Sequence, residues 1–359
     1  MLPVVAACGV TSCDMMTDDL SGCPYGLYVS FRYDYNLQRA DMFNDHVGSV
    51  TLYIFDESGK LVRTQEESNT AAAAPLADPG YSMHVTGLAP GRYRLIALAG
   101  QTAYADMMRT ERAHFVRSDM TQGSGMQDLE IQLDRKQRAA RLYDVVNNSL
   151  PLDTLWHGMT AQTVEVSGDY SGRPSYATVP LTRDTKKISV TMRELDDPTQ
   201  MDIADYGLRI VDRNSHLLWD NSLDEADTVV YTPHATWNSD DRTPAVSGGG
   251  DGGDAGAPGR IGHADFMTSR IMIHDNPADD GLLLITDRRT GAAVAALNLP
   301  DILSRLRTSD DLHAYSPQEF LDRGYDYDIS LFLKGGRLSY ANISISVLGW
   351  TKRIQFEEL

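Results

Sequence analysis

Cysteine is scarce and unevenly placed in this chain of 359 residues. The three cysteines, Cys8, Cys13 and Cys23, all lie within the first 23 residues. Their absence from the rest of the chain excludes a disulfide framework and a cysteine-based zinc site in the folded body. No stretch reaches the roughly 18 consecutive apolar residues that a membrane-spanning helix needs.

Basic residues are also under-represented. Lysine and arginine number 32 against 50 aspartates and glutamates, which gives a formal net charge of −18. Binding to phosphates needs clustered Lys and Arg, so this balance argues against nucleic acid and anionic lipid headgroups as partners. The apolar share of 42% is that of a globular protein. At about 100–200 residues per domain, the length favours two domains.

Motifs for catalysis are not found. Gly248, Gly250 and Gly253 satisfy G-x-G-x-x-G, but they neither follow a convincing strand nor open a helix. We interpret His157 as a packing residue at a domain junction and not as a base. Asp326 and Asp328 are expected on the solvent face of a strand. No nucleophile, base and oxyanion site can be assembled, so we predict no enzyme, no cofactor and no metal site.

Apolar and polar residues alternate with a period of two, which is typical of strands with one buried face. The clearest alternation covers residues 27–35, 129–133, 188–192, 325–333 and 343–347. Turn-forming residues at 56–59, 89–91 and 334–336 separate such segments. Many short strands joined by hairpins predict an all-β fold of the antiparallel sandwich type.

Helices are expected to be few. Residues 135–148 and 300–306 are the best candidates, and Pro300 followed by Asp301 suits the start of a helix. The glycine-rich residues 247–259 are predicted to form a flexible surface loop, because they bury little apolar surface.

A weak internal repeat relates residues 25–31 and 50–62 to residues 187–192 and 206–218. It predicts two domains of similar topology with a boundary near residues 156–163, although any two antiparallel hairpins can resemble each other. The expected division is a β-sandwich domain over residues 25–158 and a second one over residues 159–359, with the glycine-rich loop inside the second.

The N-terminus has the features of a secretion signal followed by a lipid attachment site. Residues 1–12 read as the end of an apolar signal segment with small residues. Val5-Ala-Ala-Cys8 and Val10-Thr-Ser-Cys13 both follow the bacterial lipoprotein pattern, in which a thiol accepts diacylglycerol. Residues 13–24 are polar and acidic, as expected of a tether. Spacing alone does not choose between Cys13 and Cys8.

Several strings spread over the chain resemble the fimbrial anchor subunits of Bacteroidales, the FimB-like lipoproteins of type V fimbriae. They are Cys13-Asp-Met-Met-Thr-Asp-Asp-Leu-Ser-Gly-Cys23-Pro24, Val50-Thr-Leu-Tyr-Ile-Phe-Asp-Glu-Ser-Gly59, Leu155-Trp-His-Gly158, Pro317-Gln-Glu-Phe-Leu-Asp-Arg323 and Ile345-Ser-Val-Leu-Gly-Trp350.

The resemblance implies two transthyretin-like β-sandwich domains in tandem and a lipidated Cys13, because the lipidated residue of the family lies about ten residues before a Cys-Pro pair. It implies a lipoprotein of the outer membrane that anchors a fimbria, limits its length and aids adhesion. The expected partners are a fimbrial stalk subunit (fimbrillin), accessory fimbrial proteins and outer-membrane lipid. The alternatives are a surface adhesin or tip lipoprotein that binds host glycan or protein, and a secreted β-sandwich enzyme.

Overall fold

The computed structural model describes residues 25–169, 173–241, 259–307, 310–347 and 350–356. Strands dominate these residues, and the longest α-helix has seven residues. The all-β class predicted from the alternating pattern is confirmed. In the described part of the chain, no helix is both long and apolar enough to cross a membrane. Cys8 and Cys13 lie outside the described ranges, so the predicted lipidation site stays a prediction. The same holds for the predicted loop over residues 247–259, of which Gly259 alone is described, as the first residue of β18.

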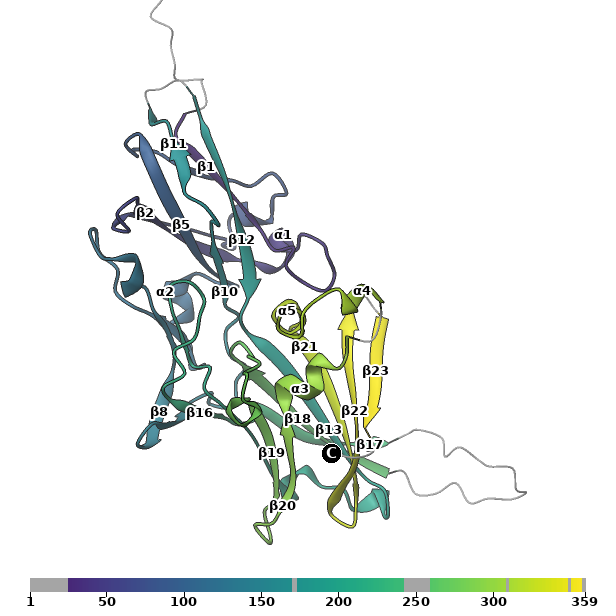
Figure 1. Ribbon diagram of the computed structural model, residues 1–359. Coiled ribbons are helices and arrows are strands. Elements are labelled where there is room, and N and C mark those ends of the chain that lie inside the picture. Colours follow the sequence, from purple (N-terminus) through teal and green to yellow (C-terminus); the bar gives the residue numbers. More distant parts are fainter. Residues whose placement is uncertain (1–24, 170–172, 242–258, 308–309, 348–349, 357–359) are drawn as a thin grey trace, which may run out of the picture.

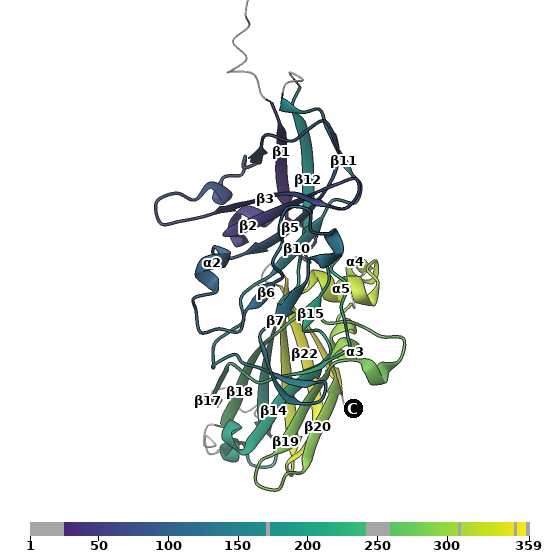
Figure 2. The same cartoon turned by 90° about the vertical axis from the view of Figure 1, so that its left-hand side faces the viewer.

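The described strands form one eight-stranded sheet, two six-stranded sheets and one three-stranded sheet. These sheets are arranged along an elongated molecule (Figures 1 and 2). The first sheet has the order β3-β2-β5-β10-β12-β1-β4, with β11 paired to β5. Its strands are β1 (Leu27–Arg32), β2 (Ser49–Asp56), β3 (Leu61–Ser68), β4 (Met83–Val85), β5 (Gly91–Gly100), β10 (Trp156–Met159), β11 (Val164–Val166) and β12 (Ser175–Arg183).

Two six-stranded sheets make up the other end of the molecule, and a small three-stranded sheet lies near the middle (Figure 2). The second sheet runs β17 (Ala235–Asp241), β18 (Gly259–Thr268), β13 (Lys186–Glu194), β21 (Asp326–Lys334), β22 (Arg337–Val347) and β23 (Trp350–Phe356). The third runs β20 (Ala293–Asn298), β19 (Leu282–Asp287), β14 (Tyr206–Asp212), β16 (Thr228–Tyr231), β9 (Leu142–Val145) and β8 (Arg135–Ala139). The small sheet runs β15 (His216–Leu217), β7 (Ile131–Leu133) and β6 (Phe115–Arg117).

The helices are short and lie between strands. The α-helices are α1 (Phe43–His46), α2 (Tyr104–Met107), α3 (Leu299–Ser304), α4 (Asp310–His313) and α5 (Pro317–Arg323). The 3-10 helices are η2 (Pro75–Ala77), η3 (Met126–Asp128), η5 (Pro198–Gln200), η6 (Ile203–Asp205) and η7 (Pro277–Asp279). Helix α3 matches the predicted helix near residue 300, with Asn298 as its N-cap.

The prediction of a helix over residues 135–148 is wrong, because these residues form the hairpin of β8 and β9. The segment has strong helix formers but lacks an apolar stripe with helical spacing, so packing decides its structure. β9 pairs in parallel with β16, and β8 lies at the edge of the third sheet with mostly exposed side chains. Lys136 and Arg138 on this edge oppose pairing with another chain.

Strand pairings cross the expected boundary between residues 158 and 159. Two strands that follow this boundary belong to the first sheet: β11 pairs with β5, and β12 pairs with β1 and β10. β7 and β9, which precede it, pair with β15 and β16 of the other sheets. The chain therefore passes between the two ends more than once, and the division into tandem domains stays a prediction.

Two clusters of buried apolar side chains form the core. One lies on the inner face of the first sheet and includes Leu27, Val29 and Trp156. The larger cluster extends through the other three sheets. β5 contributes to both clusters, because the five residues from Leu95 to Ala99 are fully buried on alternating sides. Coverage of β5 on both faces joins the first sheet firmly to the rest of the molecule.

Candidate functional site

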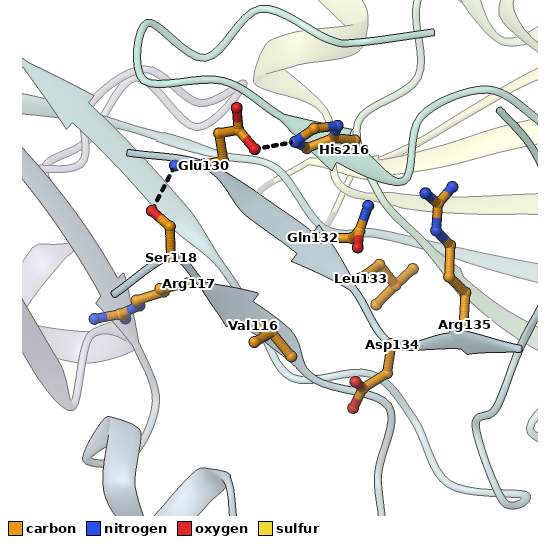
Figure 3. A pocket seen from close by; sticks show the side chains of 9 residues that line it. All are labelled: Val116, Arg117, Ser118, Glu130, Gln132, Leu133, Asp134, Arg135 and His216. Carbon is orange, nitrogen blue, oxygen red and sulfur yellow. Dashed lines mark hydrogen bonds and ion pairs between the residues drawn. The ribbon is translucent and has the colours of Figure 1, made fainter. Parts of the chain in front are cut away.

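A groove of about 350 Å³ lies over the outer face of the small sheet (Figure 3). Its floor is one row across β6, β7 and β15, in which Val116 and His216 are the direct neighbours of Gln132. The alternate residues of these strands, such as Phe115 and Ile131, are buried in the core, so the strand alternation places the polar residues in the groove. The lining residues are Val116, Arg117, Ser118, Glu130, Gln132, Leu133, Asp134, Arg135 and His216.

His216 is held between two carboxylates at one side of this groove. Its Nε2 lies 3.1 Å from Oε2 of Glu130, and its Nδ1 lies 3.4 Å from Oδ2 of Asp224. The hydroxyl of Ser118 donates to the backbone carbonyl of Asp128 at 2.6 Å and accepts from the backbone N–H of Glu130 at 3.0 Å. Both hydrogen bonds of this hydroxyl are made within the fold, and they join the end of β6 to the segment that precedes β7.

The two arginines of the groove are engaged in contacts within the fold. Arg135 lies 2.7 Å from Asp227 through Nη2, and its guanidinium is 4.0 Å from the ring centroid of Tyr143. Arg117 donates to the Thr51 hydroxyl at 2.8 Å. These contacts fix the positive charges at the groove wall, so an incoming ligand would meet preorganised side chains.

A second feature is a buried cluster of charges where the chain passes from the first sheet into the second. β12 ends at Arg183 and β13 begins at Lys186, and the two residues between them are fully buried. We call this cluster the charged junction. Its members are Arg183, Asp184, Lys186, Arg270 and Asp322. Charges so far from water persist only where partners satisfy them.

Lys186 is fully buried, and its ammonium donates three hydrogen bonds. The acceptors are the backbone carbonyls of Arg183 at 3.1 Å, Asp322 at 2.9 Å and Gly324 at 2.8 Å. Burial lowers the pKa of Lys186, and burial raises the pKa of the neighbouring carboxyl of Asp184. All three protons of the ammonium have acceptors, so this lysine links β12, β13 and the end of α5.

Asp322, in α5, binds Arg270 through both carboxylate oxygens. Nε and Nη2 of Arg270 each lie 2.7 Å from the carboxylate, and Nη1 donates to the carbonyl of Asn221 at 2.6 Å. The helix that holds Asp322 starts with Ser316 as N-cap and Pro317 in its first turn. The bidentate pair therefore joins α5 to the segment that follows β18.

Aromatic rings enclose the other side of the junction. The guanidinium of Arg183 lies 4.1 Å from the ring centroid of Tyr325 and 5.6 Å from that of Trp156. Arg323 lies 4.1 Å from the ring centroid of Tyr35. These contacts connect residues of the first sheet and its loops with the segment around α5, so the junction fixes the relative orientation of the two ends.

The sequence contained a signal for this junction that we did not use. Lys186 precedes Ile188, Val190 and Met192 at intervals of two, so it lies on the buried face of β13. A lysine in phase with core residues indicates a buried charge that needs partners. Its partners Asp322 and Arg270 are far away along the chain, and no local pattern identifies them.

His157 packs inside the protein, as predicted. It is 4% exposed, and its Nε2 lies 2.9 Å from the carbonyl oxygen of Trp219. Burial lowers the pKa of His157 to about 4. Asp326 and Asp328 lie on the face of β21 opposite to the buried Tyr327 and Ile329, also as predicted.

The depressed pKa of His157 predicts a specific loss of stability in acid. The unfolded chain binds a proton on this histidine near pH 6.5, whereas the folded chain binds it near pH 4, so stability falls as the pH drops between these values. We expect wild type to lose more stability over this range than a His157→Gln variant. Urea unfolding of both chains at pH 7, 5.5 and 4.5 measures the difference, and parallel losses would contradict it. The comparison with the variant is needed because burial raises the pKa of Asp212 to about 7, which acts in the opposite direction.

Among the described residues, no group of three or more His, Cys, Asp or Glu side chains is placed to hold a metal ion. The groove and the charged junction are both polar features that the fold builds from distant segments. Sequence analysis identified neither of them, because both depend on pairings between strands far apart in the chain.

Two solved structures from Bacteroides thetaiotaomicron are similar to this chain over most of its length. The structure of a candidate adhesin from Bacteroides thetaiotaomicron is 26% identical, with a TM-score of 0.71 over 94% of this chain and 100% of that chain. A candidate polysaccharide-binding protein from the same species is 28% identical, with a TM-score of 0.67 over 94% of this chain and 100% of that one. A search among curated proteins finds no match.

The fimbrial anchor protein Mfa2 from Porphyromonas gingivalis has the same fold. It is 16% identical, with a TM-score of 0.56 over 92% of this chain and 99% of that chain. The family model of the fimbrillin-A associated anchor proteins Mfa1 and Mfa2 matches residues 20–356, which is nearly the whole chain. The resemblance to fimbrial anchor subunits inferred from the sequence is therefore confirmed, and the chain belongs to this family of fimbrial anchor proteins.

Proposed function

We propose that this fimbrial anchor protein is held in the outer membrane by acyl chains on Cys13, and that its folded body holds the base of the fibre and limits its length. The observation that carries the proposal is the family match over residues 20–356. Anchoring is a mechanical task, and it requires attachment at two places: one to the membrane and one to the stalk subunit.

The position of the N-terminus supports attachment at one end of the molecule. Tyr25 is the first described residue, and β1 starts beside it at the end where the parallel strand β12 also starts (Figure 1). A tether over residues 13–24 would therefore connect to this end. The second and third sheets lie at the opposite end, where they are free to meet the fimbrillin stalk or accessory subunits.

Lipid attachment supplies enough energy for such an anchor. Each buried CH₂ group contributes about 0.8 kcal/mol, and a single acyl chain holds a protein only marginally, whereas two or more hold it stably. Thiol-linked diacylglycerol on Cys13 already brings two chains. Intact mass of the N-terminal peptide tests the site: we expect the lipid on Cys13, and a lipid on Cys8 with free Cys13 would overturn this assignment.

A second function, that of an adhesin or tip subunit, is favoured by the two Bacteroides relatives described as a candidate adhesin and a candidate polysaccharide-binding protein. The two functions place the protein at opposite ends of a fibre. Immunogold labelling of intact fibres separates them: an anchor is labelled at the cell-proximal end, and a tip subunit is labelled at the distal end. Distal labelling alone would contradict the anchoring role.

A further inference from the structure

An exposed row of aromatic rings crosses the end of the molecule from which the N-terminal segment leaves. His84, Tyr28 and Tyr176 are direct neighbours across β4, β1 and β12. The rings of Tyr28 and His84 stack at 4.5 Å with an interplanar angle of 8°, and those of Tyr28 and Tyr176 stack at 5.7 Å. Tyr25 contacts the His84 ring edge-on at 5.3 Å. We call these four residues the aromatic row.

Two of the four rings in the aromatic row are exposed to solvent to a large extent. Tyr176 is 70% exposed and Tyr25 is 39% exposed. The next row on the same face consists of Ser30 and Thr178, so neither of these two rows contains a carboxylate, ammonium or guanidinium group. In a chain with a net charge of −18, such a surface indicates a partner that is approached without the help of charge.

The backbone of Tyr25 and Gly26, at the start of the described chain, lies against the aromatic row. Gly26 has a φ of +76°, and a Cβ at this position would lie 2.6 Å from the carbonyl oxygen of Val85. Nε2 of His84 lies 2.7 Å from the carbonyl oxygen of Tyr25. The close approach of residues 25 and 26 to β4 therefore holds the start of the body against the aromatic row.

The neighbouring loops also have little charge. A hollow of about 600 Å³ lies between the loops that follow β4 and β11, and it is lined by Gly87, Leu88, Ala89, Pro90, Ser167, Gly168 and Asp169. Asp169 is the one carboxylate in this lining, and it accepts a hydrogen bond from the backbone N–H of Gly87 at 2.6 Å. Charged groups at this end surround the aromatic row: Arg63 donates to the carbonyl oxygen of Thr86 beside the hollow, and Arg173 is exposed just before β12. The four side chains of the row itself include no carboxylate, ammonium or guanidinium group.

We propose that the aromatic row docks onto the headgroup region of the membrane that holds the N-terminal lipid. Tyrosine has an apolar ring and a polar hydroxyl, and such side chains are enriched at the boundary between lipid and water. The docking rests on the proposed lipidation of Cys13. It adds a second contact, which orients the body relative to the membrane.

The length of the tether makes this docking feasible. Cys13 lies 12 residues before Tyr25, and an extended chain of that length spans about 40 Å. Acylation of Cys13 therefore keeps the row close to the bilayer at a high effective concentration, so weak partitioning by a few rings suffices. Because the row has no lysine or arginine, the docking does not require anionic lipid.

The geometry favours lipid over glycan as the occupant. Sugars stack on ring faces that lie open and side by side. In the aromatic row the rings of Tyr28 and His84 cover each other, so their edges point outward and Tyr176 presents the main free face. Ring edges and hydroxyl groups fit the mixed polar and apolar environment of the headgroups.

Fluorescence quenching by lipid tests the docking. The lipidated full-length chain is bound to phosphatidylcholine vesicles whose acyl chains carry bromine near the headgroup. A Tyr176→Trp variant adds a fifth tryptophan to the four of wild type, so we expect bromine to remove about a fifth more of the emission than it removes in wild type. The matched control is Tyr340→Trp, in β22 of the second sheet, for which we expect no added quenching.

The possible outcomes distinguish membrane docking, glycan binding and the lipid anchor itself. Adding Tyr28→Ser to the Tyr176→Trp chain should reduce the quenching, because it removes the central ring of the row. Equal quenching of Tyr176→Trp and Tyr340→Trp in chains that sediment with the vesicles would overturn the docking and leave the lipid anchor intact. Saturable binding of a glycan that Tyr176→Ser abolishes, with no quenching, would assign the row to glycan. Chains that fail to sediment with vesicles would overturn the lipid anchor and the docking with it.

Discussion

Replacing Asp322 by alanine is expected to lower the free energy of unfolding by about 3–5 kcal/mol, because it leaves a buried arginine without its counter-charge. Asp322 binds Arg270 through two hydrogen bonds of 2.7 Å, and the two side chains are 7% and 16% exposed. The substitution also removes one of the two acceptors of Gln318 Nε2, which keeps the carbonyl of Ile271. Urea unfolding followed by circular dichroism measures the change.

The matched control is Asp301→Ala, which breaks an ion pair on the surface. Asp301 and Arg305 lie 2.6 Å apart one helical turn from each other, and both side chains are about half exposed. Exposed pairs of this kind contribute about 0–1 kcal/mol. Similar losses in the Asp322 and Asp301 variants would contradict the structural role that we assign to the charged junction.

Replacing Gly158 by alanine is expected to cost about 3 kcal/mol, at the upper end of what overpacking a core costs. A Cβ at this position would lie 2.6 Å from Cδ2 of Leu181 and 2.9 Å from Cγ1 of Val179, and closer still to the carbonyl oxygen of Pro180. β10 is hydrogen-bonded to both β5 and β12 at this point, so the strand has no room to move away. The melting temperature and the urea midpoint both report the loss.

Gly100→Ala serves as the control for Gly158→Ala. Gly100 is at the end of β5 in the same sheet, and its nearest neighbours lie 3.4 Å from the position of a Cβ. We expect this substitution to change stability by less than 1 kcal/mol in either direction, within about the range of surface substitutions. A Gly158 variant as stable as the Gly100 variant would show that the close approach of β10 and β12 is relaxed in solution.

The Leu155-Trp-His-Gly158 string, one of those by which the family was suspected, now has a physical explanation. Trp156 is fully buried, His157 is nearly so, and Gly158 permits the contact between strands. The string reflects the packing of β10 in the middle of the first sheet. The string helped to indicate the family because its residues are fixed by the packing and hydrogen bonding of β10.

Local patterns predicted strands well where burial alternates. β13 and β21 have strictly alternating burial from Lys186 to Met192 and from Asp326 to Leu333, and both were predicted. The hairpin of β8 and β9 was missed, because its exposed residues favour a helix by propensity and only pairing with β16 makes it a strand. The groove and the charged junction were missed for a related reason: they combine residues that become neighbours only after the sheets have formed.

The parallel pair of β1 and β12 shows the limit of sequence analysis most clearly. About 150 residues separate Leu27 from Ser175, its partner in the register. Alternation predicted β1, but no feature of residues 175–183 indicates their partner. The passage of the chain from β12 into β13 through buried charges follows from this pairing.

The most direct test of the anchoring account is the distribution of fibres in a strain that carries Cys13→Ala. The substitution removes one sulfur atom from a segment that precedes the folded body, so folding and polymerisation of the stalk should continue. Without acyl chains, the acidic chain, with a net charge of −18, has no electrostatic attraction for an anionic membrane surface. The account predicts that most fibres are found in the culture supernatant, whereas a Cys23→Ala control keeps them on the cells. Fibres that stay attached to cells although the protein is shown by mass to be unlipidated would contradict the account.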